Sequence, residues 1–357
     1  SHPVGWFLLP LFAAHARQTF ELFCYSNVPR ADHVTAQLRS HADGWRDLAG
    51  QTDHQAADLI RKDRIDILVD LALHTAKNRL LVFAHKPAPV QATYLAYPGN
   101  SGLDTIDYRI TDPHLDPSDH RAPPGPEQPI RLPETYWCYQ PIVHPAPAVT
   151  PLPALVTGYV TFGCLNNFGK VTPAALAAWC RLLAAVPNAQ LLLHTHRGSH
   201  RLRLHDLFAK NDLDPQRLRF ADHLPAGQYF QSYQSIYVGL DPFPFPGGTT
   251  TCDALWMGVP VITLAGPTPV TRGGLSLLSN VGLPEMAAHS VDDYIEKASA
   301  LARELPRLAA LRASLRERMQ RSPLMDARRF VRNLEAAYRT MWHRWCAQPV
   351  PTAVATR

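Results

Sequence analysis

Short strand-like segments alternate with helix-like segments along most of this sequence, and this alternation restricts the fold more than any other feature. In the first block, segments rich in β-branched and aromatic residues predict strands at 20–26, 65–72, 89–96 and 108–112. An amphipathic segment at 53–64, between two of them, predicts a helix. Because strand–helix–strand connections produce parallel sheets, the first block predicts a parallel α/β unit.

The second block repeats the alternation more regularly. Strands are predicted at 159–165, 189–196, 217–224, 236–243 and 260–266, with helices between them. The first of these helices has Thr172 as its predicted N-cap and Pro173 at its first position. Two amphipathic helices with basic outer faces follow, at 292–320 and 326–345. The second block therefore predicts a doubly wound α/β unit.

A chain of 357 residues is longer than one hydrophobic core usually supports, so we expect two domains. The proline-rich stretch at 112–153 is predicted to be loop and linker. The predicted division is an N-terminal Rossmann-like lobe over 1–145, a C-terminal Rossmann-like lobe over 146–325, a helix over 326–346 that returns to the first lobe, and a tail over 347–357.

Composition excludes several classes of protein. The net charge of +5 is too small to indicate nucleic-acid binding, although it suits a small anionic ligand. No apolar run approaches the ~20 residues of a membrane span, so no membrane partner is expected. The six cysteines are scattered and none are at metal-ligand spacing. We interpret them as reduced thiols in a cytoplasmic protein, and we predict no structural metal.

The strongest local feature follows the strand predicted at 236–243. Gly247 and Gly248 let the backbone approach a ligand closely, and Thr249 and Thr250 open a helix. The free N–H groups and the dipole of a helix start attract phosphate. Asp253, one turn further, is suited to accept hydrogen bonds from ribose hydroxyls. The alternative is a plain loop with threonine caps, but the carboxyl end of a parallel strand favours a ligand site.

A second loop follows the strand predicted at 159–165 and contains Asn167 and Lys170. A lysine at this place can contact a diphosphate and stabilise the negative charge that builds on a leaving phosphate. The alternative is an exposed lysine at a helix start. Because the helix dipole disfavours a cation at that end, we favour a functional role for Lys170.

The first block has its own polar loop, where His74 follows the strand predicted at 65–72. Histidine exchanges a proton near neutral pH, although a loop histidine bonded to backbone fits the sequence equally well. The turn with Tyr97, Pro98 and Gly99 follows the next strand and is predicted to line the same edge. GxSxG, Walker and GxGxxG patterns are absent, so hydrolase, kinase and dinucleotide-binding functions lack support.

Five segments in a fixed order resemble the catalytic region of protein O-linked N-acetylglucosamine transferases, a family shared with SPINDLY-like O-fucosyltransferases. These segments are 86–112, 131–141, 162–193, 240–266 and 276–285. The resemblance runs from His2 to about Trp345 and is strongest to bacterial members. It implies a GT-B architecture, with two Rossmann-like domains facing each other across a cleft. It also implies inverting transfer from UDP-GlcNAc to Ser or Thr hydroxyls of proteins, without a metal or other cofactor.

The resemblance assigns roles to individual residues. Lys170, Thr249 and Thr250 match the positions that contact the donor diphosphate, and Asn167 matches a polar donor-binding position. Asp253 matches the ribose-binding aspartate.

Four further positions also carry over. Leu224 matches a position whose backbone contacts uracil, and Tyr229 replaces the histidine that stacks on it. His2 matches a histidine proposed as general base or acceptor-orienting group, and His74 matches the histidine of a Gly-His-Thr segment.

Departures from the family pattern leave alternatives open. Leu73 replaces the glycine expected before His74, and Gly248 stands where animal enzymes have histidine. The donor is therefore either UDP-GlcNAc or, as in SPINDLY-like relatives, GDP-fucose. A non-catalytic nucleotide-sugar-binding protein is a third possibility. The tetratricopeptide repeats that precede this region in the family are not found in the sequence, so we expect any such region outside this chain.

Overall fold

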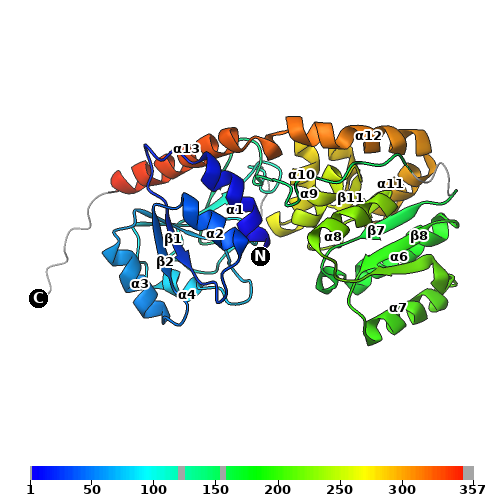
Figure 1. The fold of residues 1–357 in the computed structure, drawn as a ribbon, viewed down its shortest axis with the longest axis horizontal. Helices are drawn as coiled ribbons and strands as arrows, with labels where there is room; N and C mark the ends of the chain where they lie inside the picture. Colours follow the sequence, from blue (N-terminus) through cyan, green and yellow to red (C-terminus); the bar gives the residue numbers. More distant parts are fainter. Residues whose placement is uncertain (1, 120–124, 153–157, 349–357) are drawn as a thin grey trace, which may run out of the picture. The chain divides into compact units, whose positions relative to one another are not determined.

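The computed structural model describes residues 2–119, 125–152 and 158–348, and the chain divides into two compact units (Figure 1). The first unit comprises the described parts of Ser1–Asp112, Asp119–Tyr136 and Arg328–Arg357. The second comprises Pro113–Ser118 and the described parts of Trp137–Ala327. Residues 137–145, predicted to belong to the N-terminal lobe, thus lie in the second unit.

The first unit contains two parallel sheets. Four strands form one sheet in the order β3 (Ile67–Asp70), β4 (Val90–Thr93), β5 (Tyr108–Thr111) and β6 (Gln128–Arg131). The other consists of β1 (Phe23–Ser26) and β2 (Gly44–Asp47). The strands predicted in the first block are confirmed. The prediction of loop throughout 112–153 is wrong, because β6 lies inside it. Strand β6 contains a proline and exposes most of its residues, which is typical of an edge strand and weakens its sequence signal.

The helices of this unit are α1 (Pro3–Ala14), α2 (His33–His41), α3 (Asp53–Lys62), α4 (Leu80–Ala84) and α13 (Ala327–Cys346). Helix α3 confirms the helix predicted at 53–64, and its N-cap Thr52 forms a capping box with Gln55. Helices α1 and α2 were not predicted. Helix α13 packs on this unit, since Glu335 accepts hydrogen bonds from the Ala16 N–H at 3.0 Å and lies 3.1 Å from the His15 ring.

The second unit is built on a six-stranded parallel sheet in the order β12-β11-β10-β7-β8-β9. Its strands are β7 (Thr161–Cys164), β8 (Gln190–His194), β9 (Leu218–Ala221), β10 (Val238–Leu240), β11 (Val261–Leu264) and β12 (Ala287–Ala288). Strands β8 and β9 follow β7 in order on one side of it, and the next strand along the chain, β10, lies on the other side of β7. This reversal is the topological switch point, beside which doubly wound sheets bind their ligands.

The helices of the second unit are α6 (Pro173–Ala185), α7 (Ser199–Lys210), α8 (Ala226–Ser232), α9 (Thr249–Trp256), α10 (Gly273–Asn280), α11 (Val291–Arg303) and α12 (Leu305–Arg321). Short 3-10 helices occupy Phe168–Lys170, Pro215–Arg217, Tyr233–Ser235, Pro269–Thr271, Pro284–Met286 and Pro323–Met325. The predicted cap of α6 is confirmed, because Thr172 accepts from the Ala175 N–H at 3.2 Å. The single helix predicted at 292–320 is two helices, since a proline near the start of α12 interrupts the run.

No helix among the described residues is long and apolar enough to cross a membrane.

Candidate active site

The loop between β10 and α9 is held in place by one buried carboxylate. Asp241 follows β10 directly, and its Oδ1 accepts from the Gly247 N–H at 3.2 Å and from the Thr251 hydroxyl at 2.8 Å. Its backbone carbonyl accepts from the Tyr294 hydroxyl at 3.0 Å. Burial raises the pKa of Asp241 to about 6, while the hydroxyl and N–H donors and the charge of Lys170 act in the opposite direction. Sequence analysis did not identify Asp241, although an acidic residue directly after a strand of this block was a usable signal.

Glycine is required at position 247 by packing. A Cβ there would lie 2.6 Å from Thr250 Oγ1 and 2.9 Å from Asp241 Oδ1, and closer still to Thr251 Oγ1. These distances are shorter than any van der Waals contact. The tight loop therefore depends on Gly247, as the sequence suggested, but the neighbours that require it are the protein's own side chains.

Helix α9 begins at Thr249, after Gly248, which supplies no side chain to cap the first N–H groups. The Thr250 hydroxyl donates to Asn166 Oδ1 at 2.8 Å, and Thr249 is half-buried. Uncapped N–H groups at the start of a helix, together with its dipole, form a binding site for an anion. The start of α9 therefore retains the anion-binding capacity predicted for it.

Lys170 reaches this loop from the other side of the switch point. It ends the 3-10 helix after β7, and its Nζ donates to the Pro246 carbonyl at 3.0 Å. The same ammonium lies 3.9 Å from the centre of the Phe245 ring. Burial lowers the pKa of Lys170, and Asp241 partly opposes that shift. Lys170 is therefore not a solvated lysine at a helix start, because the fold places its charge on the loop that leads into α9.

The two neighbouring asparagines after β7 have different environments. Asn167 is exposed and caps the 3-10 helix by accepting from the Gly169 N–H at 3.0 Å. Asn166 is buried and bonds Thr250 across the switch point. Sequence analysis selected Asn167 and missed Asn166, because only the fold shows which of them turns toward α9.

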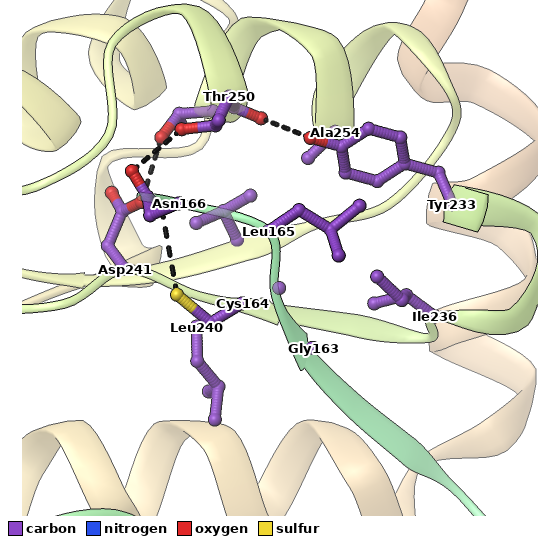
Figure 2. Close-up of a pocket in the computed structure, with 13 residues that line it drawn as sticks. Gly163, Cys164, Leu165, Asn166, Tyr233, Ile236, Leu240, Asp241, Thr250 and Ala254 are labelled. Carbon is purple, nitrogen blue, oxygen red and sulfur yellow. Dashed lines mark hydrogen bonds between the residues drawn. The ribbon is translucent and has the colours of Figure 1, made fainter. Parts of the chain in front are cut away.

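A small pocket lies under the start of α9, between the ends of β7 and β10. Figure 2 shows Asn166 and Thr250 joined across it, with Asp241 and Tyr233 at its sides. Its free volume of about 20 Å³ holds about one water molecule and is too small for a nucleotide. The pocket is therefore not the nucleotide site itself, and its lining mixes the polar Asn166, Asp241 and Thr250 with apolar side chains.

Asp253 is buried, with 2% of its surface exposed, and both of its carboxylate oxygens have partners. The Tyr139 hydroxyl donates to Oδ1 at 2.7 Å, and the Tyr229 hydroxyl is hydrogen-bonded to Oδ2 at 2.9 Å. Burial raises the pKa of Asp253 to about 7. Two predicted nucleotide-binding residues, Asp253 and Tyr229, therefore bond each other here rather than presenting free polar groups. The other predicted base-site residue, Leu224, is half-buried in the loop between β9 and α8.

The Trp137 indole packs closely against Gly248. A Cβ on Gly248 would lie 3.1 Å from the end of the Trp137 indole ring. A side chain at position 248 would require the indole to move by a few tenths of an ångström. Packing against Trp137 therefore favours glycine at this position.

In the first unit, His74 and the turn after β4 come together as predicted. His74 Nε2 lies 2.8 Å from the Asn100 carbonyl, and its ring meets the Tyr97 ring edge to face at 5.9 Å. A carbonyl only accepts, so Nε2 carries the proton and the neutral ring has its lone pair on Nδ1. Pro98 is buried and Gly99 half-buried in the same turn.

Leu73 has a φ of +45°, in the left-handed region that favours glycine. Its N–H donates to the buried Asp70 at 2.7 Å, which holds the turn before His74. Burial raises the pKa of Asp70. This chain therefore has a buried leucine in a backbone conformation that glycine adopts at lower cost.

His2, the remaining candidate, is exposed and forms the N-cap of α1, where its Nδ1 accepts from the Val4 N–H at 3.3 Å. Across the described ranges, no group of three or more His, Cys, Asp or Glu side chains is arranged to hold a metal ion.

Two parallel α/β units, the second of them doubly wound with a helix start suited to an anion at its switch point, are the architecture of the GT-B fold class. The comparisons agree. The chain belongs to glycosyl transferase family 41, whose model matches residues 1–137 and 152–334. The predicted α/β fold class of the GT-B type and the family resemblance are both confirmed.

Individual relatives give the same picture. The chain is 40% identical to a tomato (Solanum lycopersicum) protein described as a probable UDP-N-acetylglucosamine–peptide N-acetylglucosaminyltransferase SPINDLY, over 99% of this chain and 38% of that protein. It is 31% identical to the Arabidopsis thaliana protein SEC, described as a probable enzyme of the same activity, over 98% of this chain and 37% of that protein. A lysine-to-methionine mutant of the Thermobaculum terrenum O-GlcNAc transferase superposes with a TM-score of 0.88 at 38% identity, covering 97% of this chain and 66% of that one. The chain thus spans a little over a third of the curated relatives' length.

Proposed function

We propose that this chain is the catalytic region of an inverting glycosyltransferase that moves N-acetylglucosamine from UDP-GlcNAc to Ser or Thr hydroxyls of proteins. The observation that carries the proposal is the position of Lys170. Its ammonium lies on the Pro246 carbonyl, next to the loop that opens α9. A cation and uncapped helix N–H groups together form the environment that a leaving diphosphate needs. The names of the family relatives support the donor and the peptide acceptor.

The mechanism follows from the charge that develops during transfer. The acceptor hydroxyl attacks the anomeric carbon from the face opposite UDP, and negative charge grows on the β-phosphate. Lys170 and the α9 start, with Thr249 and Thr250, stabilise this charge more in the transition state than in the ground state. Because these groups supply the positive charge, no metal is required.

The hydrogen bonds of the two histidines suggest different roles for them. Nδ1 of His2 accepts from backbone, so the neutral ring presents an N–H at Nε2 and is suited to orient the acceptor. His74 has its lone pair on Nδ1, the position required of a base; an oxygen of the α-phosphate or a water chain are the alternatives. A pH–rate profile that keeps its acidic limb in His74→Gln excludes His74 as the base.

A second candidate donor is GDP-fucose. It is favoured by the Trp137–Gly248 pair and by Tyr229, which change the walls of the donor site from those expected of the animal enzymes. The cytoplasmic location, the bacterial source and a tetratricopeptide-repeat region outside this chain remain predictions from the resemblance.

A transfer assay with both donors tests the proposal. The purified chain is incubated with a Ser/Thr-rich peptide library and with radiolabelled UDP-GlcNAc or GDP-fucose, and label in peptide is counted. Label from UDP-GlcNAc alone supports the proposal, and label from GDP-fucose alone supports the second candidate. If the chain binds either nucleotide without transferring a sugar, it is a nucleotide-sugar-binding protein.

A further inference from the structure

The carboxylate predicted to bind a ribose, Asp253, is bonded on both oxygens by the protein's own side chains. Asp253 lies one turn into α9 and is 2% exposed. Tyr229, from α8, occupies its Oδ2, and Tyr139, from the chain after β6, occupies Oδ1. A ribose hydroxyl that is to bond Asp253 must first displace one of these two tyrosines.

A chain of hydroxyls continues from this carboxylate to the anion site. The Tyr229 and Tyr233 hydroxyls lie 2.7 Å apart, and the Tyr233 hydroxyl donates to the Thr250 carbonyl at 3.1 Å. When Asp253 is ionised, the Tyr229 hydroxyl donates to Asp253 and the Tyr233 hydroxyl donates to the Thr250 carbonyl. No proton is then left for a hydrogen bond between the two tyrosines. When Asp253 is protonated, its carboxyl donates to the Tyr229 hydroxyl, Tyr229 donates to Tyr233, and Tyr233 donates to the Thr250 carbonyl. All three contacts are then hydrogen bonds. Proton counting therefore favours the neutral carboxyl in this closed arrangement.

The two tyrosines differ in how firmly they are held. Tyr139 is 3% exposed, and its backbone N–H donates to the Leu324 carbonyl at 2.7 Å. Tyr229 is half-buried and belongs to the short helix α8, whose flanking residues 226–228 are exposed. Displacing Tyr229 from Asp253 therefore costs less free energy than displacing Tyr139.

We propose that Tyr229 is a latch on the nucleotide site, whose hydroxyl takes the Asp253 oxygen that a ribose hydroxyl needs and is displaced when a ribonucleoside diphosphate sugar binds. The inference rests on the proposed function, because it concerns the same donor site. The hydroxyls of a bound ribose donate to an ionised carboxylate, so opening of the latch transfers the Asp253 proton to solvent. Binding therefore releases a proton and strengthens as the pH rises.

Few charged or titratable groups face Asp253. Tyr139, Tyr229 and Tyr233 surround the carboxylate, Cys252 precedes it on α9, and Tyr139 acts on the pKa of Arg316 of α12. The pKa values of the three tyrosines and the cysteine are raised by burial, so these groups stay neutral near pH 7. Asp241, after β10, acts on Tyr233 and Cys252 and has a pKa of about 6, and burial raises the pKa of Asp253 to about 7, so both carboxyls titrate in the range of the experiment and the Asp253→Asn variant separates them.

Calorimetric titration with UDP-GlcNAc tests the latch. The bridged diphosphate of this ligand does not titrate near neutrality, and measurement in buffers of different ionisation enthalpy counts the protons released. The wild type is expected to release close to one proton per nucleotide at about pH 6 and far less at about pH 8. Asp253→Asn is expected to bind more weakly and to release none from this site.

Tyr229→Phe is the decisive variant, because it keeps the ring and removes the hydroxyl. It is expected to bind UDP-GlcNAc about three- to tenfold more tightly than the wild type, since a hydrogen bond of the closed form is lost. Tyr139→Phe is the matched control and is expected to show no gain. Unchanged or weaker binding by Tyr229→Phe, a gain in Tyr139→Phe instead, or equal proton release in Asp253→Asn overturns the latch. If neither the wild type nor Tyr229→Phe binds nucleotide, the proposed function fails as well.

Discussion

Replacing Gly247 by alanine places a methyl group where the loop has no room for one. The added Cβ would lie 2.6 Å from Thr250 Oγ1 and 2.9 Å from Asp241 Oδ1. Neither partner can withdraw freely, because Thr250 donates to the buried Asn166 and Asp241 holds both Gly247 and Thr251. The substitution must therefore push the loop away from Asp241.

The expected cost has two parts. Overpacking of this kind costs about 1–3 kcal/mol. The two hydrogen bonds to Asp241 that are strained or lost contribute about 1 kcal/mol each. A combined loss of about 3–5 kcal/mol lowers the melting temperature of a unit of this size by roughly 6–20 °C.

Thermal unfolding and UDP titration of Gly247→Ala measure both consequences. Binding is expected to weaken at least tenfold, because the displaced loop no longer presents the α9 N–H groups to an anion. Gly227→Ala is the matched control: it lies in α8, nothing stands within 4 Å of its Cβ, and it gains about 0.5–1 kcal/mol from helix propensity. A Gly247→Ala protein with wild-type melting and wild-type affinity would refute the packing described for this loop.

Three further predictions address the buried acid, the strained turn and the metal. The pKa of Asp253 is raised from 3.8 to about 7, so the folded state holds this proton more tightly than the unfolded chain does. The free energy of unfolding of the wild type is therefore expected to fall by on the order of 4 kcal/mol as the pH rises from about 4 to 7. Denaturant titrations across this range should show a flatter profile in Asp253→Asn; an equally steep one would mean that Asp253 is not the group responsible. Leu73→Gly relieves the left-handed backbone but removes a side chain that is 1% exposed, so we expect a net loss of about 1–2 kcal/mol in urea unfolding, whereas a gain would show that strain dominates. Transfer from UDP-GlcNAc should survive EDTA at full rate, and a loss restored by Mg²⁺ or Mn²⁺ would contradict the charge arrangement proposed around Lys170.

The second sheet and the residues that gather at its switch point could be predicted from sequence because their signals are local. Strand-like segments, the Thr172 cap and the Gly247–Thr250 run each lie within a few residues. Parallel topology then brings Lys170 to the same sheet edge as Pro246, although 76 positions separate them.

Other features depend on partners that are distant in sequence. The closure of Asp253 requires Tyr139, 114 positions away, and no local pattern indicates that the two meet. Asn166 and Asn167 are adjacent residues of the same type, so the sequence does not show which of them is buried. The path of the chain after β7 decides this. Strand β6 was missed because an exposed edge strand lacks apolar alternation, and β2 because its four residues, 44–47, include none that is β-branched.

The rate of sugar transfer by Lys170→Ala tests the central claim most directly. Saturating UDP-GlcNAc separates kcat from binding, and Lys210→Ala, an exposed lysine at the end of α7, is the matched control. We expect kcat to fall by on the order of 100-fold or more in Lys170→Ala, while its melting temperature and the activity of Lys210→Ala stay near the wild type. A Lys170→Ala protein that folds normally and transfers at the wild-type rate would contradict the assignment of this site.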